Sequence, residues 1–356
     1  MMRPAPDKTL KILHKGLEMT MGRKIAEIET LKSSVRQSSS IRFARVTFAD
    51  QDTMHLWAKT LRGARDSMIT QDRTARDFDL HKLLYAVFEA DGPFRVPRPL
   101  FHSPEDRLIV TEHCGGYRLQ DKIERLARGF PRAEPIRELQ QDCLRAGLWL
   151  QAFQAATREH APGVAAGLDA QPLMDFRRVV ALTSERFKEL VTQIPSARGP
   201  LQSSEILNFL DKRLASTEPD SHLTCSIHGD FFPGNLLVHR RAVCGIDFSS
   251  ATWGSPWFDP SYFVFQLETL TNKPWFRRKT VTALIDTFLD GYGSSMRHHN
   301  FWRAAPGMEI LHFSHSIARL LSLSKSTHQL NLKAIYRRYL MRGLVQTLST
   351  HLRSQV

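Results

Sequence analysis

One stretch near the middle of the chain, residues 224–262, combines three acidic side chains and an amide at short spacings. Its sequence is TCSIHGDFFPGNLLVHRRAVCGIDFSSATWGSPWFDPSY. Asn235 follows Asp230 by five residues, Asp247 comes twelve residues later, and Asp259 after a further twelve. No other part of the chain places so strong a constraint on what it can fold into.

Three short runs in this stretch are rich in strand-forming residues, namely residues 224–227, 236–239 and 243–246. Glycine and proline between the first two runs predict a loop, and two arginines between the last two predict a hairpin turn. Asp230 and Asn235 then lie in the loop before the hairpin, and Asp247 lies where its second strand ends. The hairpin should bring its two ends, and so these side chains, together.

An amide and two carboxylates at adjoining loop ends suit a site for Mg²⁺ and a triphosphate. Mg²⁺ takes hard oxygen ligands and keeps substrate phosphates in its coordination shell. A separate carboxylate is needed to orient an attacking hydroxyl and accept its proton. Asp and Gly are also ordinary turn residues, but a turn alone does not require Asn235 and Asp247 at these spacings.

These motifs resemble those of the aminoglycoside phosphotransferase and choline kinase family, which has a protein-kinase-like fold. The family pattern is HGDxxxxN, then a hydrophobic residue followed by Asp and Phe or Trp, then GxPxxDP. The chain has HGD at 228–230 with Asn235, IDF at 246–248 and GSPWFDP at 254–260, in the same order. The resemblance implies transfer of the ATP γ-phosphoryl group to a small-molecule hydroxyl, with ATP and Mg²⁺ as cofactors.

The resemblance also implies a role for each of these residues. Asp230 would act as the catalytic base, and Asn235 and Asp247 would hold Mg²⁺. Asp259 would support the catalytic loop through backbone N–H groups, and His228 would be structural.

Residues 41–48 and 54–61 are strand-like and read as the start of a kinase amino-terminal lobe. By the resemblance, Lys59 would hold the α- and β-phosphates. Its acidic partner would come from a helix predicted over residues 73–89. Asp77 fits best, with Asp79 and Glu89 as alternatives; the family usually has Glu, so this is a departure.

Two further segments would contact the nucleotide. The serine-rich segment 33–40 is expected to be the turn that covers the phosphates, with donors at Ser38, Ser39 and Ser40. After a strand at 108–111, backbone groups from Glu112 to Cys114 would bind an adenine edge, and the following glycines would allow a flexible hinge.

These elements predict an α+β, two-lobed protein-kinase-like fold with a small β-rich amino-terminal lobe and a larger, mainly helical carboxy-terminal lobe. The expected parts are a helical extension at 1–32, a nucleotide-binding lobe at 33–112, and a catalytic and substrate-binding lobe at 113–356. Helical spacing recurs at residues 119–126, 136–157, 173–194, 201–214, 260–270, 276–292, 299–323 and 332–352.

Composition predicts a cytoplasmic protein. The chain has no apolar run of about 18 residues and no apolar core typical of a signal peptide at its start. Its four cysteines, Cys114, Cys143, Cys225 and Cys244, are scattered, which favours reduced thiols. The amphipathic helical pattern in residues 10–31 allows peripheral contact with an acidic membrane surface, although a helix packed on the domain is commoner.

The charge of the chain narrows the class of substrate that we expect. The net charge is +13, and residues 261–356 hold 13 Lys and Arg against 4 Asp and Glu. A pocket for polycationic aminoglycosides should be acidic, so a neutral or anionic hydroxyl compound, such as a sugar or glycolipid head group, is preferred. Aminoglycoside, choline or ethanolamine kinase activity remains the alternative. A second alternative is a non-catalytic kinase-like protein that binds nucleic acid or an acidic surface, although no nucleic-acid partner is expected.

Overall fold

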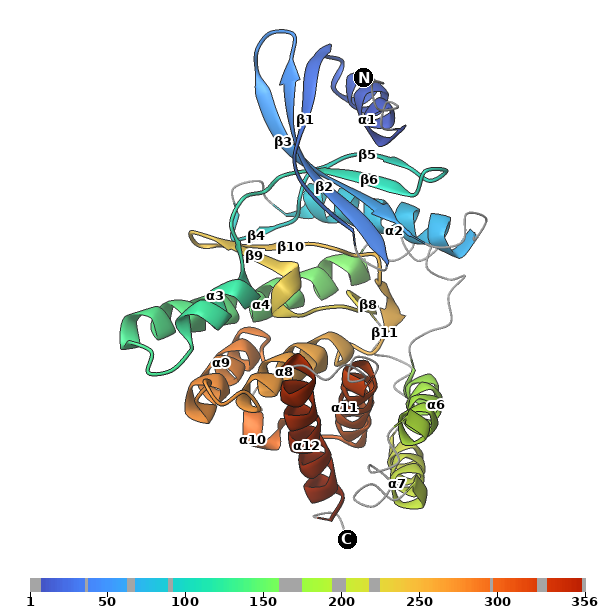
Figure 1. Cartoon of the computed structure of the whole chain (residues 1–356), viewed down its shortest axis with the longest axis vertical. Helices are drawn as coiled ribbons and strands as arrows, with labels where there is room; N and C mark the ends of the chain where they lie inside the picture. The colour runs from blue at the N-terminus through green and yellow to red at the C-terminus, as the bar shows by residue number, and fades with distance from the viewer. Residues whose placement is uncertain are drawn as a thin grey trace. The chain divides into compact units, whose positions relative to one another are not determined.

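The computed structural model describes residues 8–35, 38–62, 68–88, 92–159, 175–193, 203–217, 225–294, 297–324 and 332–353. They form two compact units. The first contains residues up to 117 together with 235–251, and the second contains most of the remaining chain. The first unit is β-rich and the second is mainly helical (Figure 1), which confirms the predicted α+β, kinase-like fold class. Residues 235–251 belong to the first unit in this division, and the lobe boundary at 112/113 stays a prediction.

The first unit is built on a five-stranded antiparallel sheet in the order β1-β2-β3-β6-β5 (Figure 1). Its elements are α1 (Lys8–Met21), β1 (Ile25–Val35), β2 (Ser39–Phe48), β3 (Thr53–Leu61), α2 (Met68–Val87), β4 (Phe94–Arg95), β5 (Pro99–Ser103) and β6 (Leu108–Glu112). A second sheet, in the order β4-β10-β9-β7, adds β7 (Tyr117–Arg118), β9 (Leu236–His239) and β10 (Ala242–Gly245). The predicted strands 41–48, 54–61 and 108–111 and the predicted hairpin over 236–246 are therefore confirmed.

Helix α1 packs against this sheet. Leu13 and Leu17 are fully buried in one cluster with Val46 and Phe48 of β2. The apolar face of α1, on which the prediction of a membrane-surface helix was based, is therefore packed in the core of the first unit.

The prediction that residues 25–31 continue the helical extension is wrong. Gly22 ends α1 with a left-handed φ of 63°, and its N–H donates to the Glu18 carbonyl at 2.9 Å. The chain then forms β1, which pairs with β2 from Ile25↔Phe48 to Val35↔Ser40. The apolar spacing of residues 25–31 fits a helix as well as a strand, and pairing with β2 decides between them.

The predicted serine turn over 33–40 is also corrected. Residues 33–35 belong to β1, and Ser39 and Ser40 begin β2. Ser40 pairs with Val35 on one side and with Thr60 on the other, so its backbone lies inside the sheet. Residues 36 and 37 of the connection lie outside the described residues.

The second unit comprises helices and one small sheet. Its elements are α3 (Leu119–Leu126), α4 (Ala133–Glu159), α6 (Phe176–Gln193), α7 (Ser203–Ser216), β8 (Cys225–Ile227), β11 (Thr252–Gly254), α8 (Phe258–Thr271), α9 (Arg278–Gly291), α10 (His298–Phe301), α11 (Pro306–Ser324) and α12 (Leu332–Arg353). The helical predictions hold, except that the expected helix over 299–323 is divided into α10 and α11, with Pro306 starting the second.

Stacked aromatic rings form the core of this unit. Trp149 of α4 lies 5.8 Å from Phe231, and Phe263 of α8 lies 4.0 Å from Phe288 of α9, measured between ring centroids. Helices α4 and α9 approach closely at glycines: a Cβ at Gly147 would lie 2.3 Å from the Phe288 carbonyl oxygen. Phe231, next to Asp230, is therefore anchored in the centre of the unit.

Candidate active site

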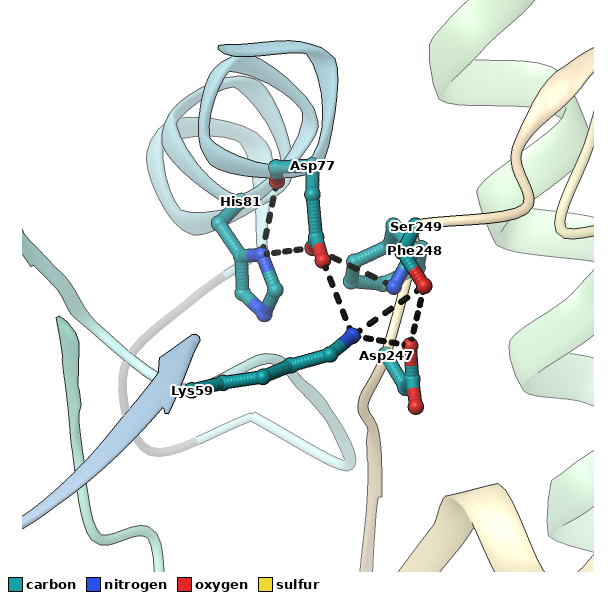
Figure 2. Close-up of polar contacts among 6 residues, drawn as sticks. All are labelled: Lys59, Asp77, His81, Asp247, Phe248 and Ser249. Carbon is teal, nitrogen blue, oxygen red and sulfur yellow. Dashed lines mark hydrogen bonds and ion pairs between the residues drawn. The ribbon is translucent and has the colours of Figure 1, made fainter. Parts of the chain in front are cut away.

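Lys59 lies at the centre of a polar cluster in the first unit. It occupies β3, where it pairs with Ile41 of β2 and Ile109 of β6. Figure 2 shows its ammonium group among three oxygen partners. Nζ lies 2.5 Å from Asp247 Oδ1, 3.1 Å from Ser249 Oγ and 3.4 Å from Asp77 Oδ2. The sheet holds the lysine stem, and the acidic side chains fix its charged end.

Asp77 of α2 is the predicted helix acid, and the structure places it beside Lys59 (Figure 2). Its side chain is 2% exposed and also accepts a hydrogen bond from the Phe248 N–H at 3.2 Å. His81 Nδ1 lies 3.1 Å from Asp77 Oδ1. Of the alternatives, Asp79 is exposed and Glu89 lies outside the described residues.

Electrostatics keep this pair ionised. Burial alone would lower the pKa of Lys59, but the negative charges of Asp77 and Asp247 outweigh it and raise that pKa. Burial likewise acts to raise the pKa of Asp77, but the charge of Lys59 and the His81 hydrogen bond lower it overall. The site therefore contains a fixed cation between two carboxylates.

Asn235 and Asp247 lie at the same end of the β9–β10 hairpin. Leu236 pairs with Gly245, and the Ile246 N–H donates to the Asn235 carbonyl at 3.0 Å. Asp247 has a left-handed φ of 69°, a conformation that costs energy for a residue other than glycine. The hairpin and this backbone geometry present the Asp247 carboxylate to Lys59.

The donors at this hairpin end fit a magnesium site. An amide and a carboxylate supply hard oxygen ligands, and Mg²⁺ commonly uses one or two carboxylates plus phosphates. Among the described residues, no group of three His, Cys, Asp or Glu side chains could hold a metal ion by itself.

The HGD loop belongs to the second unit and is held by Asp259. Asp259, in the first turn of α8, accepts hydrogen bonds from the backbone N–H groups of His228 at 2.6 Å and Gly229 at 2.9 Å. Gly229 has a φ of 76°, which favours glycine at this turn. Burial raises the pKa of Asp259 to about 7, although both N–H donors act to lower it. The expected support of the loop by Asp259 is thus visible as two hydrogen bonds.

His228 is fully buried, with its ring 5.8 Å from that of Phe231. Asp230 itself is partly buried. Burial raises the pKa of the Tyr262 phenol to about 12, and the charge of Asp230 and a hydrogen bond to it add to the effect. Tyr262 therefore lies against Asp230. Asn235 and Asp247 belong to the other unit, so convergence of Asp230 with them stays a prediction.

The predicted adenine-binding segment follows β6. The N–H of Glu112 donates to the Arg98 carbonyl and the N–H of His113 donates to the His55 carbonyl, both at 2.9 Å. These two donors are therefore used within the first unit. Cys114 comes next, and its sulfur lies beside that of Cys244.

Sequence reasoning missed several residues of the site. Ser249 and His81 both bind members of the Lys59 cluster, and Tyr262 interacts with Asp230. His81 carries a detectable signal, because it lies four residues after Asp77 and so on the same helix face. Ser249 and Tyr262 carry none, since their contacts depend on the fold.

The second unit has a small cavity of about 70 Å³ beside the HGD loop. Phe232 and Pro233, which follow Asp230, form part of its wall. Its other described lining residues are Gln120, Ile123, Glu124, Gln266, Leu267, Thr269, Leu270, Lys273 and Arg319.

The sequence profile of the phosphotransferase enzyme family (APH) matches residues 59–304. The chain belongs to this family. As a phosphotransferase, it shares its fold with several solved structures. No curated protein matches the chain.

Three solved structures illustrate the shared fold. A provisionally assigned aminoglycoside phosphotransferase from Ralstonia eutropha JMP134 has 13% identity and a TM-score of 0.60, covering 96% of this chain and 98% of its own. Amicoumacin kinase hAmiN, in complex with AMP-PNP, Ca²⁺ and Ami, has 13% identity and a TM-score of 0.56, covering 97% and 94%. The GDP complex of the aminoglycoside 2′-phosphotransferase-IIIa F108L mutant has 16% identity and a TM-score of 0.53, covering 97% and 98%. Sequence identities of 13% to 16% show that these proteins share a fold with this chain, and they show the fold alone.

Within the described ranges, every helix is too short or too polar to cross a lipid bilayer.

Proposed function

We propose that this phosphotransferase moves the γ-phosphoryl group of ATP to a hydroxyl of a neutral or anionic small molecule. The observation that carries the proposal is the Lys59 cluster, in which one ammonium group is held between Asp77 and Asp247. Phosphoryl transfer requires a lysine that a helix acid holds in place. It also requires a second acid that can bind Mg²⁺. Solved structures of the same fold in complex with AMP-PNP or with streptomycin and ATP support the nucleotide assignment.

Each residue has a proposed role at the nucleotide. Lys59 would bind the α- and β-phosphates, while Asp77 holds its ammonium group in place. Asn235 and Asp247 would hold Mg²⁺. Bound Mg²⁺ would neutralise charge on the phosphate oxygens as the transition state forms.

Other residues would bind the nucleotide through a backbone N–H group or through a side-chain hydroxyl. The backbone N–H of Cys114 would bind the adenine edge, since those of Glu112 and His113 are already used. Ser38, before β2, remains a proposed phosphate contact, whereas Ser39 and Ser40 lie in the sheet. A solved structure of the same fold contains GDP. The assay described below therefore compares GTP with ATP.

Asp230 would accept a hydrogen bond from the acceptor hydroxyl and take its proton during transfer. Tyr262 would position its carboxylate, and Asp259 accepts two hydrogen bonds from the loop that carries it. Positioning and charge neutralisation supply most of the catalysis in such a reaction, so a rigid loop matters.

The cavity beside the HGD loop supports a neutral or anionic acceptor, such as a sugar or glycolipid head group. Among its described lining residues, Glu124 is the only acid, and Lys273 already pairs with it at 3.2 Å. Arg319 adds a positive charge to the same wall. A polycationic aminoglycoside would need several free carboxylates there, so antibiotic phosphorylation is the less favoured alternative, as is a choline or ethanolamine substrate.

We further propose a cytoplasmic location, because the reaction consumes ATP. Contact with an acidic membrane surface is not favoured by α1, since its apolar face is packed in the core. Nucleic acid is not an expected partner, although the net charge of +13 motivates that alternative.

A panel of hydroxyl metabolites assayed for ATP and GTP consumption with Mg²⁺ tests the function. The panel should include neutral sugars, sugar phosphates, choline and an aminoglycoside. Asp230→Asn should lower kcat by about 10²- to 10⁴-fold, the usual range for a general base. Asp79→Asn, which removes an exposed acid, is the matched control. Turnover that survives Asp230→Asn would refute the assigned role, and salt-sensitive RNA or DNA binding without turnover would favour the non-catalytic alternative.

A further inference from the structure

Two of the four cysteines meet in the first unit. The sulfur atoms of Cys114 and Cys244 lie 2.9 Å apart, although 130 residues separate them in the sequence. Both are free thiols, as are Cys143 and Cys225, which are buried in the second unit. The pair was not visible in the sequence, because only the fold brings the chain after β6 against β10.

The backbone around Cys114 holds it against the β9–β10 hairpin. Cys244 is fixed in β10 by pairing with Leu237 of β9. Gly116 packs so tightly on β9 that an added Cβ would lie 2.8 Å from the Val238 carbonyl oxygen. Gly115 and Gly116 have positive φ values of 69° and 93°, which let the chain turn here. The contact between the two thiols is therefore part of how this segment packs on the hairpin.

The two thiols differ in access and in charge. Cys114 is partly exposed and lines a cavity of about 180 Å³ with Arg95, Arg98 and Glu112. The hydrogen bond from Cys244 lowers the pKa of Cys114, and the charge of Arg95 lowers it further. Cys244 is buried, and burial raises its pKa well above the ordinary value. Cys114 is thus the more nucleophilic thiol and Cys244 the sheltered one.

We propose that Cys114 and Cys244 form a reversible thiol–disulfide site that reacts with small anionic disulfides such as oxidised glutathione. The Cys114 thiolate attacks one sulfur of the glutathione disulfide, which breaks that S–S bond and releases one glutathione thiolate. The Cys244 thiol then loses its proton to solvent and attacks the Cys114 sulfur. A Cys114–Cys244 disulfide forms and the second glutathione leaves. The two protein thiols lose two electrons, and glutathione disulfide gains them.

The cavity beside Cys114 favours this class of oxidant. Arg95 and Arg98 both line this cavity beside Cys114, and Arg98 also lies 3.7 Å from Glu112. Two arginines in the wall next to the thiol favour an oxidant that carries carboxylates, as glutathione disulfide does. The sheltered thiol then lies within reach of the mixed disulfide.

The test exposes the folded full-length protein to oxidised glutathione, quenches it with acid, and maps its peptides by mass spectrometry. The wild type should yield a linked Cys114–Cys244 peptide that dithiothreitol reverses. Cys244→Ser should instead retain glutathione on Cys114, because no second thiol displaces it. Cys114→Ser should show neither product. Cys143→Ser and Cys225→Ser are matched controls that should behave as the wild type.

Three results would overturn the proposal. The first is folded wild type that stays fully reduced while urea-unfolded chain reacts. The second is glutathione retained on Cys114 in the wild type as fully as in Cys244→Ser. The third is modification of Cys143 or Cys225 before Cys114. Circular dichroism of each variant confirms that it is folded, and none of these readouts depends on phosphotransferase activity.

Discussion

Lys59 and Asp247 form an ion pair across 188 residues of sequence, with 2.5 Å between Nζ and Oδ1. Asp77 of α2 pairs with the same ammonium group. Strand, helix and hairpin thus meet at one lysine within the first unit. Changes at any of the three side chains should disturb the other two.

Asp77→Asn should lower kcat/KM for ATP by about 10- to 100-fold, because Lys59 loses a fixed partner and small displacements at a reacting centre are costly. The KM for ATP should rise as well. Asp79→Asn removes an exposed acid two residues away and should leave both values near those of the wild type. Equal losses in the two variants would show that Asp77 has no special role.

Asp247→Asn should raise the Mg²⁺ concentration needed for half-maximal turnover. Loss of a ligand charge should cost at least as much as loss of an outer partner, on the order of 10- to 100-fold. Asp106→Asn, which removes an acid of the same unit that pairs with Lys8 instead, is the control. An unchanged Mg²⁺ requirement would argue that the ion is held elsewhere.

Asp259→Ala should destabilise the protein. It leaves the buried N–H of His228 and the partly buried N–H of Gly229 without their acceptor, and a buried unsatisfied donor costs about 1–3 kcal/mol. Chemical denaturation measures the loss. Asp286→Ala, which removes the acceptor for the His298 N–H, is a comparison with one bond instead of two. Equal losses would contradict the proposed importance of the loop bonds.

His315 should make stability fall in acid. Burial lowers its pKa to about 3, and His312 on α11 and Arg186 on α6 act in the same direction. Its ring lies against Phe258, Tyr262 and Phe265 and its Nε2 lies 3.0 Å from Ser261 Oγ, all on α8.

Because this folded pKa is below the unfolded one, the unfolded chain binds a proton first. The stabilisation that neutral, buried His315 contributes is therefore fully present above about pH 6.5, and it is lost as the pH falls toward 3. Between pH 7 and 5 the loss from this group is about 2 kcal/mol. His315→Gln should show a correspondingly shallower decline in unfolding free energy, and parallel pH curves would refute it.

Gly147→Ala should destabilise the second unit by more than about 1–3 kcal/mol, the usual cost of overpacking, because its Cβ would meet the Phe288 backbone. Gly343→Ala is the control, since its Cβ would lie 3.2 Å from the Asn272 side chain. The melting temperatures should separate the two variants. Similar values would mean that α4 and α9 can move apart at little cost.

The sequence predicted the parts of this site that depend on local patterns. The hairpin, the helix that carries Asp77 and the position of Lys59 in a strand follow from periodicity and turn residues. Asp77 was preferred to Asp79 and Glu89 although the family usually has Glu there, and the structure places it beside Lys59.

Other features depend on pairing between distant segments. Residues 25–31 have apolar spacing that suits a helix, and only pairing with β2 makes them a strand. Ser249 reaches Lys59, and Cys114 reaches Cys244, through contacts spanning 190 and 130 residues. Local propensity contains no information about such contacts, so these could not have been predicted.

The packing of α1 also determines where this enzyme can be shortened. The family match begins at Lys59, yet Leu13, Leu17 and Ile25 lie in one hydrophobic cluster with β2, β3 and β6. A fragment cut at the start of the matched segment would keep Lys59 but lose α1, β1, β2 and most of β3, the strand that carries Lys59. The folding unit of this protein therefore begins well upstream of the part that identifies its family.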